Sequence, residues 1–368
     1  MRFIYQLKDW PCFRWNSTEV ENLLAEASFT LGRFLGRLGS IGFNVQNEAA
    51  CEMLSVEILN SAEIEGEKLN REDVRSSVAR RMEIATAMAN GGGSYESEAR
   101  ADMMFDATRN WQVEMTKERL FSWHAALFPT GYSGLAKISV GMLRDDRDGA
   151  MRVVSRRGML ERVHFVAPDA SKLDGELSKF LDFANGKDVK MPWLVATAIA
   201  HLWFLTLHPF DDGNGRLARA LTEYMLAKGE RSSMRFYSLS SQIQKEKDAY
   251  YEELQCTQRG TLDVTKWVKW FLECHKKAVM TAQERLSSIF AKADFWQKYA
   301  ENGFNANQRR MLNRLFDGFE GNLTSSKWAK MCKVSQDTAS REINALVSMG
   351  VLVQQGQGRS THYVMEKP

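Results

Sequence analysis

The sequence has few residues of the types that interrupt helices or cross-link small domains. Its 368 residues include only six prolines and five cysteines, and no two cysteines show the C-x-x-C spacing of a zinc or redox site. Scarce proline favours helix, and scattered cysteines are typical of a reducing compartment rather than a disulfide framework. We therefore predict a mainly α protein located in the cytoplasm.

Long hydrophobic runs and a strong charge of one sign are also missing. No apolar run reaches the roughly 18 residues of a membrane-spanning helix. The opening run MRFIYQLKDWPCFRW lacks the apolar segment and cleavage site of a signal peptide. The net charge of +3 is too small to imply attraction of the whole surface to nucleic acid or membrane. We expect no membrane partner and a chain long enough for two or three domains.

Apolar residues recur at helical spacing along most of the chain. The periodicity predicts helices over residues 17–38, with Ser17 or Thr18 as the cap, and over 45–61, 71–90, about 98–128, 170–185, 191–207, 213–228, and two or three more within 245–300. The segment 191–207 is apolar nearly all round, which indicates a buried central helix. Residues 131–168 are rich in glycine and short β-branched runs, which predicts one or two β-hairpins.

The C-terminal residues have a composition of their own. Over 305–368 the pattern predicts a helix, then a helix–turn–helix, then two strands joined by QGQGRS. Nine Lys and Arg against five Asp and Glu give this tail a net charge of +4. We predict three domains: an N-terminal helical domain over 1–90, a core over 91–300 and a C-terminal domain over 301–368.

Polar and flexible residues are concentrated in HPFDDGNGRLAR, residues 208–219, directly after the predicted central helix. A helix that begins near Asn214 would present free N–H groups and the positive end of its dipole to an anion such as phosphate. Arg216 and Arg219 share one face of that helix and can grip phosphates. Asp212 is a suitable ligand for Mg²⁺, and His208 can accept a proton near neutral pH.

Two interpretations of this stretch remain open from spacing alone. It forms either a polyphosphate site with a general base or an ordinary turn between helices with a structural histidine. It matches neither G-x-x-x-x-G-K-[ST] nor a G-x-G-x-x-G that follows a strand, which excludes the two familiar phosphate loops.

The same stretch resembles the signature of the Fic family, H-P-F-x-[DE]-G-N-G-R-x-x-R, and agrees at every defined position. Fic proteins typically transfer AMP from ATP, with Mg²⁺, to a hydroxyl side chain of a target protein. The resemblance implies a Fic helical core with a β-hairpin flap, and a nucleotidyltransferase activity. It makes His208 the base that deprotonates the target hydroxyl and Asp212 the metal ligand.

The second half of the signature implies the nucleotide contacts. By resemblance, Asn214 and the backbones of Gly213 and Gly215 hold the α-phosphate, Arg216 holds the β-phosphate and Arg219 the γ-phosphate. Leu217 and Ala218 lie between the two arginines and complete the expected nucleotide-binding stretch.

Two further segments resemble parts of that family. MRVVSRRGMLERVHFVAP is similar to the hairpin flap that aligns a target segment, with Val163, His164 and Phe165 as its site-facing positions. For His164 a structural or adenosine-contacting role is favoured over a catalytic one. DAYYEELQCTQ resembles the segment that lines the nucleoside, which makes Tyr250, Tyr251 and Gln258 candidates. Packing on a helix surface explains the tyrosines equally well.

The segment SAEIEGEKLN, residues 61–70, interrupts two predicted helices. From spacing alone it is an ordinary solvated turn. Ser61, Glu65 and Gly66 nevertheless match the [ST]-x-x-x-E-[GN] inhibitory motif that some Fic proteins carry. The resemblance implies that Glu65 pairs with Arg219, obstructs the γ-phosphate and keeps the enzyme autoinhibited.

The two ends of the chain resemble known accessory domains. Residues from DWPCFRWN onward are similar to the N-terminal domain of a bacterial Fic subgroup, and the tail resembles a winged helix. A winged helix binds DNA or protein, and Thr338, Ser340 and Arg341 are the candidates for DNA contact.

Three functions are compatible with these residues. The first is a protein adenylyltransferase that acts on a Ser, Thr or Tyr hydroxyl of a partner protein. A homodimer is compatible with this function. The second is a hydrolase that removes AMP with the same site, and the third is a winged-helix transcriptional regulator whose Fic region senses nucleotide.

Overall fold

The computed structural model of the chain describes residues 2–39, 41–84, 94–147, 149–157, 160–187, 189–316, 319 and 321–366. The chain forms two compact units, Met1–Arg285 and Leu286–Pro368. The proposed division at residues 90 and 300 stays a prediction. No helix among the described residues is long and apolar enough to cross a membrane.

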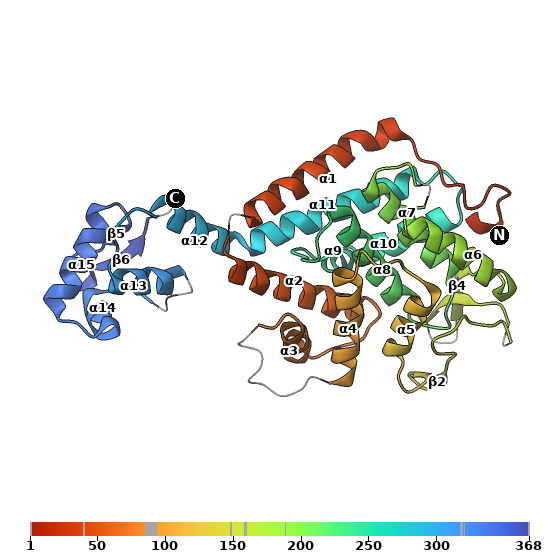
Figure 1. Cartoon of the computed structure of the whole chain (residues 1–368), viewed down its shortest axis with the longest axis horizontal. Helices are drawn as coiled ribbons and strands as arrows, with labels where there is room; N and C mark the ends of the chain where they lie inside the picture. The colour runs from red at the N-terminus through yellow and green to blue at the C-terminus, as the bar shows by residue number, and fades with distance from the viewer. Residues whose placement is uncertain are drawn as a thin grey trace. The chain divides into compact units, whose positions relative to one another are not determined.

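The centre of the larger unit is the helix pair α7 (Trp193–Leu207) and α8 (Asn214–Glu230) (Figure 1). Every residue of α7 after Trp193 is buried, as the sequence predicts for a helix without a polar face. Helices α6 (Ala170–Ala184) and α11 (Thr265–Arg285) pack on α7. The two ends of the 208–219 stretch are thereby fixed in the core.

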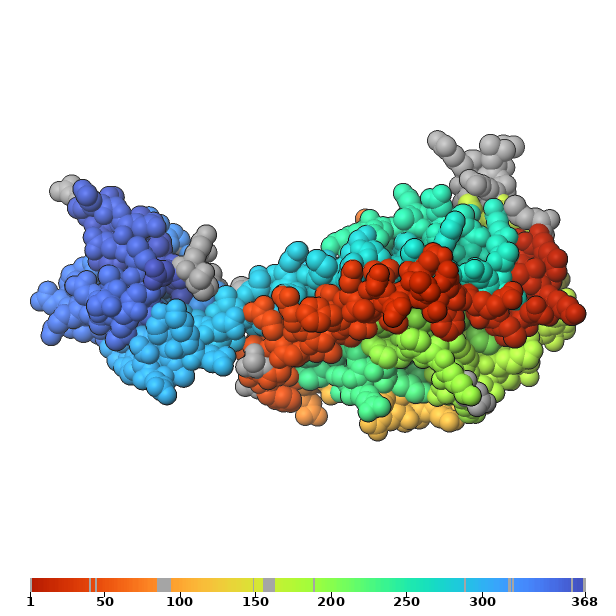
Figure 2. Space-filling view, turned by 90° about the horizontal axis from the view of Figure 1, so that it is seen from above, coloured from red at the N-terminus to blue at the C-terminus, as the bar shows by residue number. Residues whose placement is uncertain are grey.

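The N-terminal helices pack directly on this core. They are the 3-10 turn η1 (Ile4–Gln6), α1 (Ser17–Leu38), α2 (Phe43–Ile64) and α3 (Arg71–Arg81). Helix α1 runs along α11, as Figures 1 and 2 show, and α2 packs on α9 (Leu239–Lys245). The end of α2 that carries Glu65 is therefore held by the same core that holds α8.

Several predicted boundaries need correction. Asn16 rather than Ser17 or Thr18 caps α1, because its side chain accepts the N–H groups of Thr18 and Glu19. Helix α3 ends at Arg81, before the predicted end at residue 90, and residues 85–90 lie outside the described residues.

The continuous helix predicted over 98–128 was wrong. It is two helices, α4 (Tyr95–Arg109) and α5 (Lys117–Leu127), and Thr116 caps the second. The remaining helices of the larger unit include α10 (Lys247–Gln258).

Two antiparallel hairpins lie in the glycine-rich region, as predicted. The first joins β1 (Tyr132–Ser133) to β2 (Ala136–Lys137), and the second joins β3 (Arg152–Arg157) to β4 (Leu160–Val166). The register of the second hairpin shifts between Val153 and Val154, which places His164 at an irregularity of the strand.

The smaller unit follows the element order that its sequence predicts. It contains α12 (Ser287–Lys298), α13 (Ala306–Phe316), α14 (Ser325–Cys332), α15 (Gln336–Ser348), and the antiparallel strands β5 (Leu352–Gln355) and β6 (His362–Met365), between which lies the turn η3 (Gly358–Ser360). Trp328 is fully buried in its core and donates to Glu342 at 2.6 Å. Thr338, Ser340 and Arg341 lie on α15 and are partly or fully exposed. The winged-helix assignment and DNA contact by these residues stay predictions.

Candidate active site

His208 ends α7 in a left-handed conformation, with φ 48° and ψ 57°. This strained geometry turns the chain sharply away from the buried helix. Arg144, which is 3% exposed, stabilises the turn because its Nε donates to the carbonyl of His208 at 2.8 Å. Arg144 is in turn paired with Asp146 at 2.6 Å. No sequence pattern predicts this contact, since 64 residues separate the two partners.

The loop between the helices is closed by its own side chains. Asn214 is buried and bonds Phe210 in both directions: its Nδ2 donates to the Phe210 carbonyl at 2.8 Å, and its Oδ1 accepts the Phe210 N–H at 3.1 Å. The side chain of Asn214 therefore shapes the loop. His124 of α5 supports the other side, with its ring stacked 4.2 Å from Phe210 and its Nε2 at 3.2 Å from the Asp212 carbonyl.

The imidazole of His208 has the chemistry of a base. Burial lowers its pKa to about 4, while the Leu205 carbonyl, 3.4 Å from Nδ1, acts in the opposite direction. The ring is therefore neutral at neutral pH. An Nδ1–H that donates to Leu205 leaves the lone pair on Nε2, to which no described residue is hydrogen-bonded. Nε2 can accept a proton.

Asp212 lies between this base and the arginines. Its carboxylate is 45% exposed, accepts the Ser133 hydroxyl and the Gly213 N–H, and lies 3.6 Å from Arg216. The described residues contain no group of three or more His, Cys, Asp or Glu that would hold a metal. Magnesium bound to phosphates needs only one or two protein carboxylates. A half-exposed Asp212 fits that requirement.

The N-terminus of α8 already has an acidic oxygen against it. Gly213 caps the helix with φ 81°, and a Cβ built on Gly215 would lie 2.1 Å from Oε1 of Glu65. The missing side chain at residue 215 is what lets this carboxylate approach the first turn. A carboxylate here satisfies the positive end of the dipole, as a phosphate would.

Arg219 is the contact point of the predicted inhibitory residues. It is 2% exposed and its Nη2 lies 2.8 Å from Oε1 of Glu65. Its Nε donates to the Ser61 hydroxyl at 2.9 Å, and Nη2 donates to the Ser61 carbonyl at 2.8 Å. Burial alone would lower the pKa of Arg219, but the charge of Glu65 and its hydrogen bond, together with Tyr250 and Tyr251, raise that pKa above its usual value. The Glu65–Arg219 pair that the motif implied is present.

Gly66 makes the turn that carries Glu65. With φ 82°, it lets the N–H of Glu67 reach the Ala62 carbonyl at 3.1 Å and its own N–H reach Glu63 at 2.9 Å. These two bonds form a Schellman motif, which ends α2. The turn directs two carboxylates, those of Glu65 and Glu67, toward α8.

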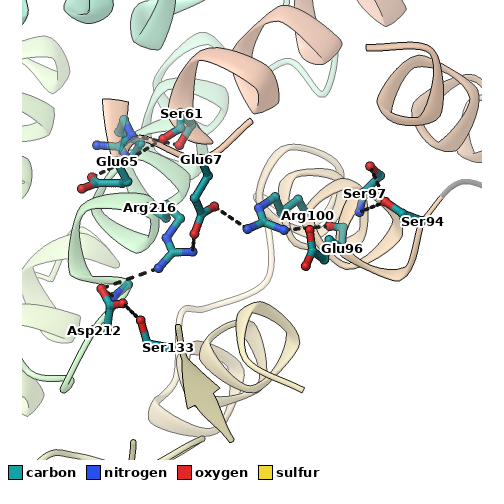
Figure 3. A network of polar contacts seen from close by, with 12 residues as sticks. Ser61, Glu65, Glu67, Ser94, Glu96, Ser97, Arg100, Ser133, Asp212 and Arg216 are labelled. Carbon is teal, nitrogen blue, oxygen red and sulfur yellow. Dashed lines mark hydrogen bonds and ion pairs between the residues drawn. The ribbon is translucent and has the colours of Figure 1, made fainter. Parts of the chain in front are cut away.

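Glu67 is a residue that the motif comparison missed. Its carboxylate bridges two arginines: Oε1 lies 2.5 Å from Arg216 and Oε2 lies 2.5 Å from Arg100 of α4 (Figure 3). All three cationic and acidic partners come from different elements, so no periodic pattern in the sequence links them. Arg216 is thus occupied by an internal carboxylate, as Arg219 is.

The three residues predicted to line the nucleoside differ in burial. Tyr250 is 1% exposed and its hydroxyl bonds His201 at 3.0 Å, within a network that includes Thr222, so it serves the core. Tyr251 is half-buried, and burial together with Glu65 raises its pKa to about 12. Gln258 is buried, and its Nε2 donates to the Leu205 carbonyl at 3.4 Å beside His208. Only Tyr251 keeps exposed surface near the arginines.

The remaining predicted contacts are placed by packing. Leu217 and Ala218 are fully buried and anchor α8 in the core. Phe165 is 2% exposed and packs edge-on against Phe3, with ring centroids 5.0 Å apart. Its ring therefore lies in the core, whereas the resemblance placed it on the docking surface of the flap. Arg259 donates to the carbonyls of Val163 and His164, at 3.3 and 2.6 Å. The docking role of the β3–β4 hairpin stays a prediction.

Comparisons with known proteins agree with this site. The sequence model of the Fic/DOC family matches residues 114–226, which include the 208–219 stretch, and that of a domain of unknown function, DUF4172, matches residues 3–84. The fold is similar to the crystal structure of a Fic family protein from Desulfovibrio desulfuricans G20, with a TM-score of 0.57, 19% identity, and coverage of 96% of this chain and 98% of that one. It is also similar to a fragment of Fic-1 from C. elegans, with a TM-score of 0.50, 18% identity and 74% of each chain covered.

The fold and site therefore define a mainly helical protein in which His208, Asp212 and two arginines meet at the junction of α7 and α8. The chain contains a domain of the Fic/DOC family, preceded by a DUF4172 region. Fic domains generally bind nucleotide with a metal and transfer nucleotide groups.

Proposed function

We propose that the chain is a protein adenylyltransferase that transfers AMP from ATP to a Ser, Thr or Tyr hydroxyl and is autoinhibited by Glu65. The observation that carries the proposal is the meeting of His208, Asp212, Arg216 and Arg219 at the start of α8. A neutral base, a metal-binding carboxylate and two guanidinium groups lie around one anion-binding helix end.

The reaction is an in-line displacement at the α-phosphorus of ATP. Nε2 of His208 accepts the proton of the target hydroxyl while the hydroxyl oxygen forms the new bond to the α-phosphorus. The bond from the α-phosphorus to the bridging oxygen breaks, and pyrophosphate leaves. Arg216 and Arg219 bind the β- and γ-phosphates, and the backbone of α8 receives the α-phosphate. Asp212 would hold Mg²⁺, and the bound ion would neutralise phosphate charge.

The autoinhibition follows from the position of Glu65. Its carboxylate takes Arg219 and lies against Gly215, where the phosphates have to approach. A phosphate chain and this carboxylate repel each other and compete for one arginine. ATP that binds beside Glu65 is therefore misplaced for attack.

The test is incubation with α-³²P-labelled ATP and Mg²⁺ of four chains: wild type, Glu65→Gly, Glu65→Gly with His208→Ala, and Glu63→Gly. Glu63 is an exposed acid on the same helix, so its variant controls for the loss of charge and for the glycine itself. We expect protein-bound label with Glu65→Gly, on the enzyme itself or on proteins of a lysate. Wild type and Glu63→Gly should give little, and the double variant none.

Two outcomes would refute the proposal. No transfer by Glu65→Gly from any nucleoside triphosphate would exclude a transferase, and transfer that survives His208→Ala would exclude the assigned base. Loss of label from modified protein after wild-type chain is added would assign the hydrolytic reaction to the same site.

A further inference from the structure

Arg100 is a buried cation outside the family signature that faces the same site. It lies on α4, is 7% exposed, and its Nη1 donates to the Glu96 carbonyl of its own helix at 3.1 Å. Its Nη2 reaches Oε2 of Glu67 at 2.5 Å, while Arg216, 4% exposed, holds Oε1 at 2.5 Å. One carboxylate thus joins a residue of α4 to a residue of the nucleotide-binding helix (Figure 3).

The two guanidinium groups are not saturated by Glu67. The Nε atoms of Arg100 and Arg216 are both buried, and neither has a hydrogen-bond partner among the described residues. Both side chains line a small pocket, whose other walls are Ile58, Ser61, Ala62, Met103, Met104 and Leu127. Buried donors without acceptors are costly, so an oxygen atom that reached these two Nε groups would be stabilised.

Glu67 is the less firmly held member of this cluster. Its side chain is 35% exposed, and it extends from the turn that follows α2 rather than from a helix. Arg216 is fixed by contrast, since its guanidinium also lies over the Phe128 ring at 4.8 Å. The cations are therefore preorganised, and the anion is the part that can leave.

The charges at the junction are balanced only while both glutamates stay. Arg100, Arg216 and Arg219 face Glu65, Glu67 and Asp212. Withdrawal of Glu65 and Glu67 leaves three guanidinium groups against the single carboxylate of Asp212. Such an excess of buried positive charge favours a ligand with several negative charges, such as a chain of phosphates, and disfavours neutral or cationic ligands.

We propose that Arg100 and Arg216 form an anion subsite that binds the phosphates beyond the α-phosphate of the nucleotide, and that Glu67 fills this subsite in the present structure. The proposal rests on the proposed function for the identity of the nucleotide. It adds Arg100 to the residues that bind the polyphosphate chain. It also makes Glu67 a second internal competitor, which acts on Arg216 as Glu65 acts on Arg219.

The experiment measures equilibrium binding of ATP, ADP, AMP and pyrophosphate, with Mg²⁺, to the full chain by titration calorimetry. Glu67→Gln keeps the shape of the side chain but removes the negative charge that pairs with both arginines, and Glu63→Gln is the matched loss of an exposed acid. We expect Glu67→Gln to bind ATP, ADP and pyrophosphate about tenfold more tightly, because charged hydrogen bonds become available to phosphate. Binding of AMP, and binding of all ligands to Glu63→Gln, should change by less than about twofold.

The role of Arg100 is tested on the released background. In the double variant Glu67→Gln, Arg100→Gln the gain for ATP and ADP should disappear. Arg100→Lys keeps the charge but not the forked donors, so it should lose most of the gain and covers the case in which Arg100→Gln fails to fold. Thermal melts establish folding of each chain.

Four results would overturn the proposal: no gain with Glu67→Gln, an equal gain for AMP, a gain that persists without Arg100, or a gain for pyrophosphate alone. The last would assign the pocket to the free leaving group rather than to bound nucleotide. Because binding is measured without transfer, a failed labelling experiment with Glu65→Gly leaves this test intact, and a failed binding test leaves the transferase proposal intact.

Discussion

Glu65 lies close to Gly215, so the effect of Gly215→Ala on stability should depend on whether Glu65 is present. We expect the substitution to destabilise the wild type and to stabilise a chain that lacks Glu65. Gly215→Ala places a Cβ 2.1 Å from Oε1 and 3.0 Å from Cδ of Glu65, and 3.3 Å from Nη1 of Arg219. In the wild-type chain the carboxylate has to move, and the pair with Arg219 breaks. When Glu65 is already Ala, the same Cβ has no carboxylate to meet.

The expected change in the free energy of unfolding differs between the wild-type and Glu65→Ala backgrounds. Alanine in place of glycine in a helix stabilises by about 0.5–1 kcal/mol. Breaking a buried ion pair from one side costs about 3–5 kcal/mol. Here Glu65 is 30% exposed and Ser61 still accepts two bonds from Arg219, so about 2 kcal/mol is the better figure. Gly215→Ala should therefore destabilise the wild type by about 1 kcal/mol and stabilise Glu65→Ala by up to about 1 kcal/mol.

The assay is differential scanning calorimetry of the full chain at neutral pH. For a unit of this size, about 1 kcal/mol corresponds to roughly 2 °C in Tm. The transition of the larger unit should fall by about 2 °C when Gly215→Ala is made in the wild type, and rise slightly when it is made in Glu65→Ala. A Glu63→Ala background is the control and should behave as wild type.

A shift of the same sign and size in both backgrounds would refute the reasoning. It would mean that the carboxylate of Glu65 does not lie against the first turn of α8 in solution. The experiment thus measures the coupling free energy between residues 65 and 215, which we expect to be about 2 kcal/mol.

Four further outcomes follow from the site and its supports. Because burial lowers the pKa of His208 to about 4, kcat/KM of Glu65→Gly should stay level between pH 8 and 6, and a pH–rate profile with a midpoint near 6.5 would contradict this. Burial also lowers the pKa of His124 to about 4 and of His201 and His275 to about 3, so the unfolded chain binds more protons below pH 6.5 than the folded one; stability should be complete above pH 6.5 and fall by about 2 kcal/mol per buried histidine at pH 5, as urea unfolding at the two pH values would show. Arg144→Lys removes the forked support of the His208 carbonyl and should lower kcat of Glu65→Gly by about ten- to a hundredfold with ATP affinity unchanged, whereas a loss of affinity alone would argue against a positioning role. Glu57 of α2 is buried and accepts from the Ser238 hydroxyl at 2.7 Å and the Ser240 N–H at 2.9 Å, so Glu57→Gln should loosen α2 and raise basal labelling of the otherwise wild-type chain; labelling at or below the wild-type level would contradict that link.

Regular elements were predictable where one local rule decided them. The range of α1 agrees at both ends because the apolar spacing is unbroken and Gly39 follows it. The buried α7 and the start of α8 were equally plain, since an apolar run gives way to a glycine-rich turn. The break between α4 and α5 was missed because the apolar pattern continues through residues 110–116, and only Thr116 signals a new start.

The supports of the site could not be predicted because they are single residues brought together by the fold. Arg144 and His208 are 64 residues apart, and Glu67 and Arg216 are 149 apart. No periodicity connects such pairs, and nothing in the sequence around each residue names its partner. The burial of Tyr250 could not be predicted either, because its motif resemblance says nothing of the buried His201 that bonds its hydroxyl.

The way Arg219 is held explains how an internal glutamate can be displaced without loss of the fold. Ser61 accepts from both Nε and Nη2 of Arg219, and it does so from within α2, one turn before Glu65. When Glu65 leaves, those two bonds persist, so the buried guanidinium keeps its direction and two of its acceptors. Glu65 and Glu67 stand on either side of Gly66, at a turn rather than in the helix, and both can withdraw while Ser61 stays in place. Under the proposed function, Ser61 therefore maintains the position of Arg219, and Glu65 is the part of the contact that blocks the site.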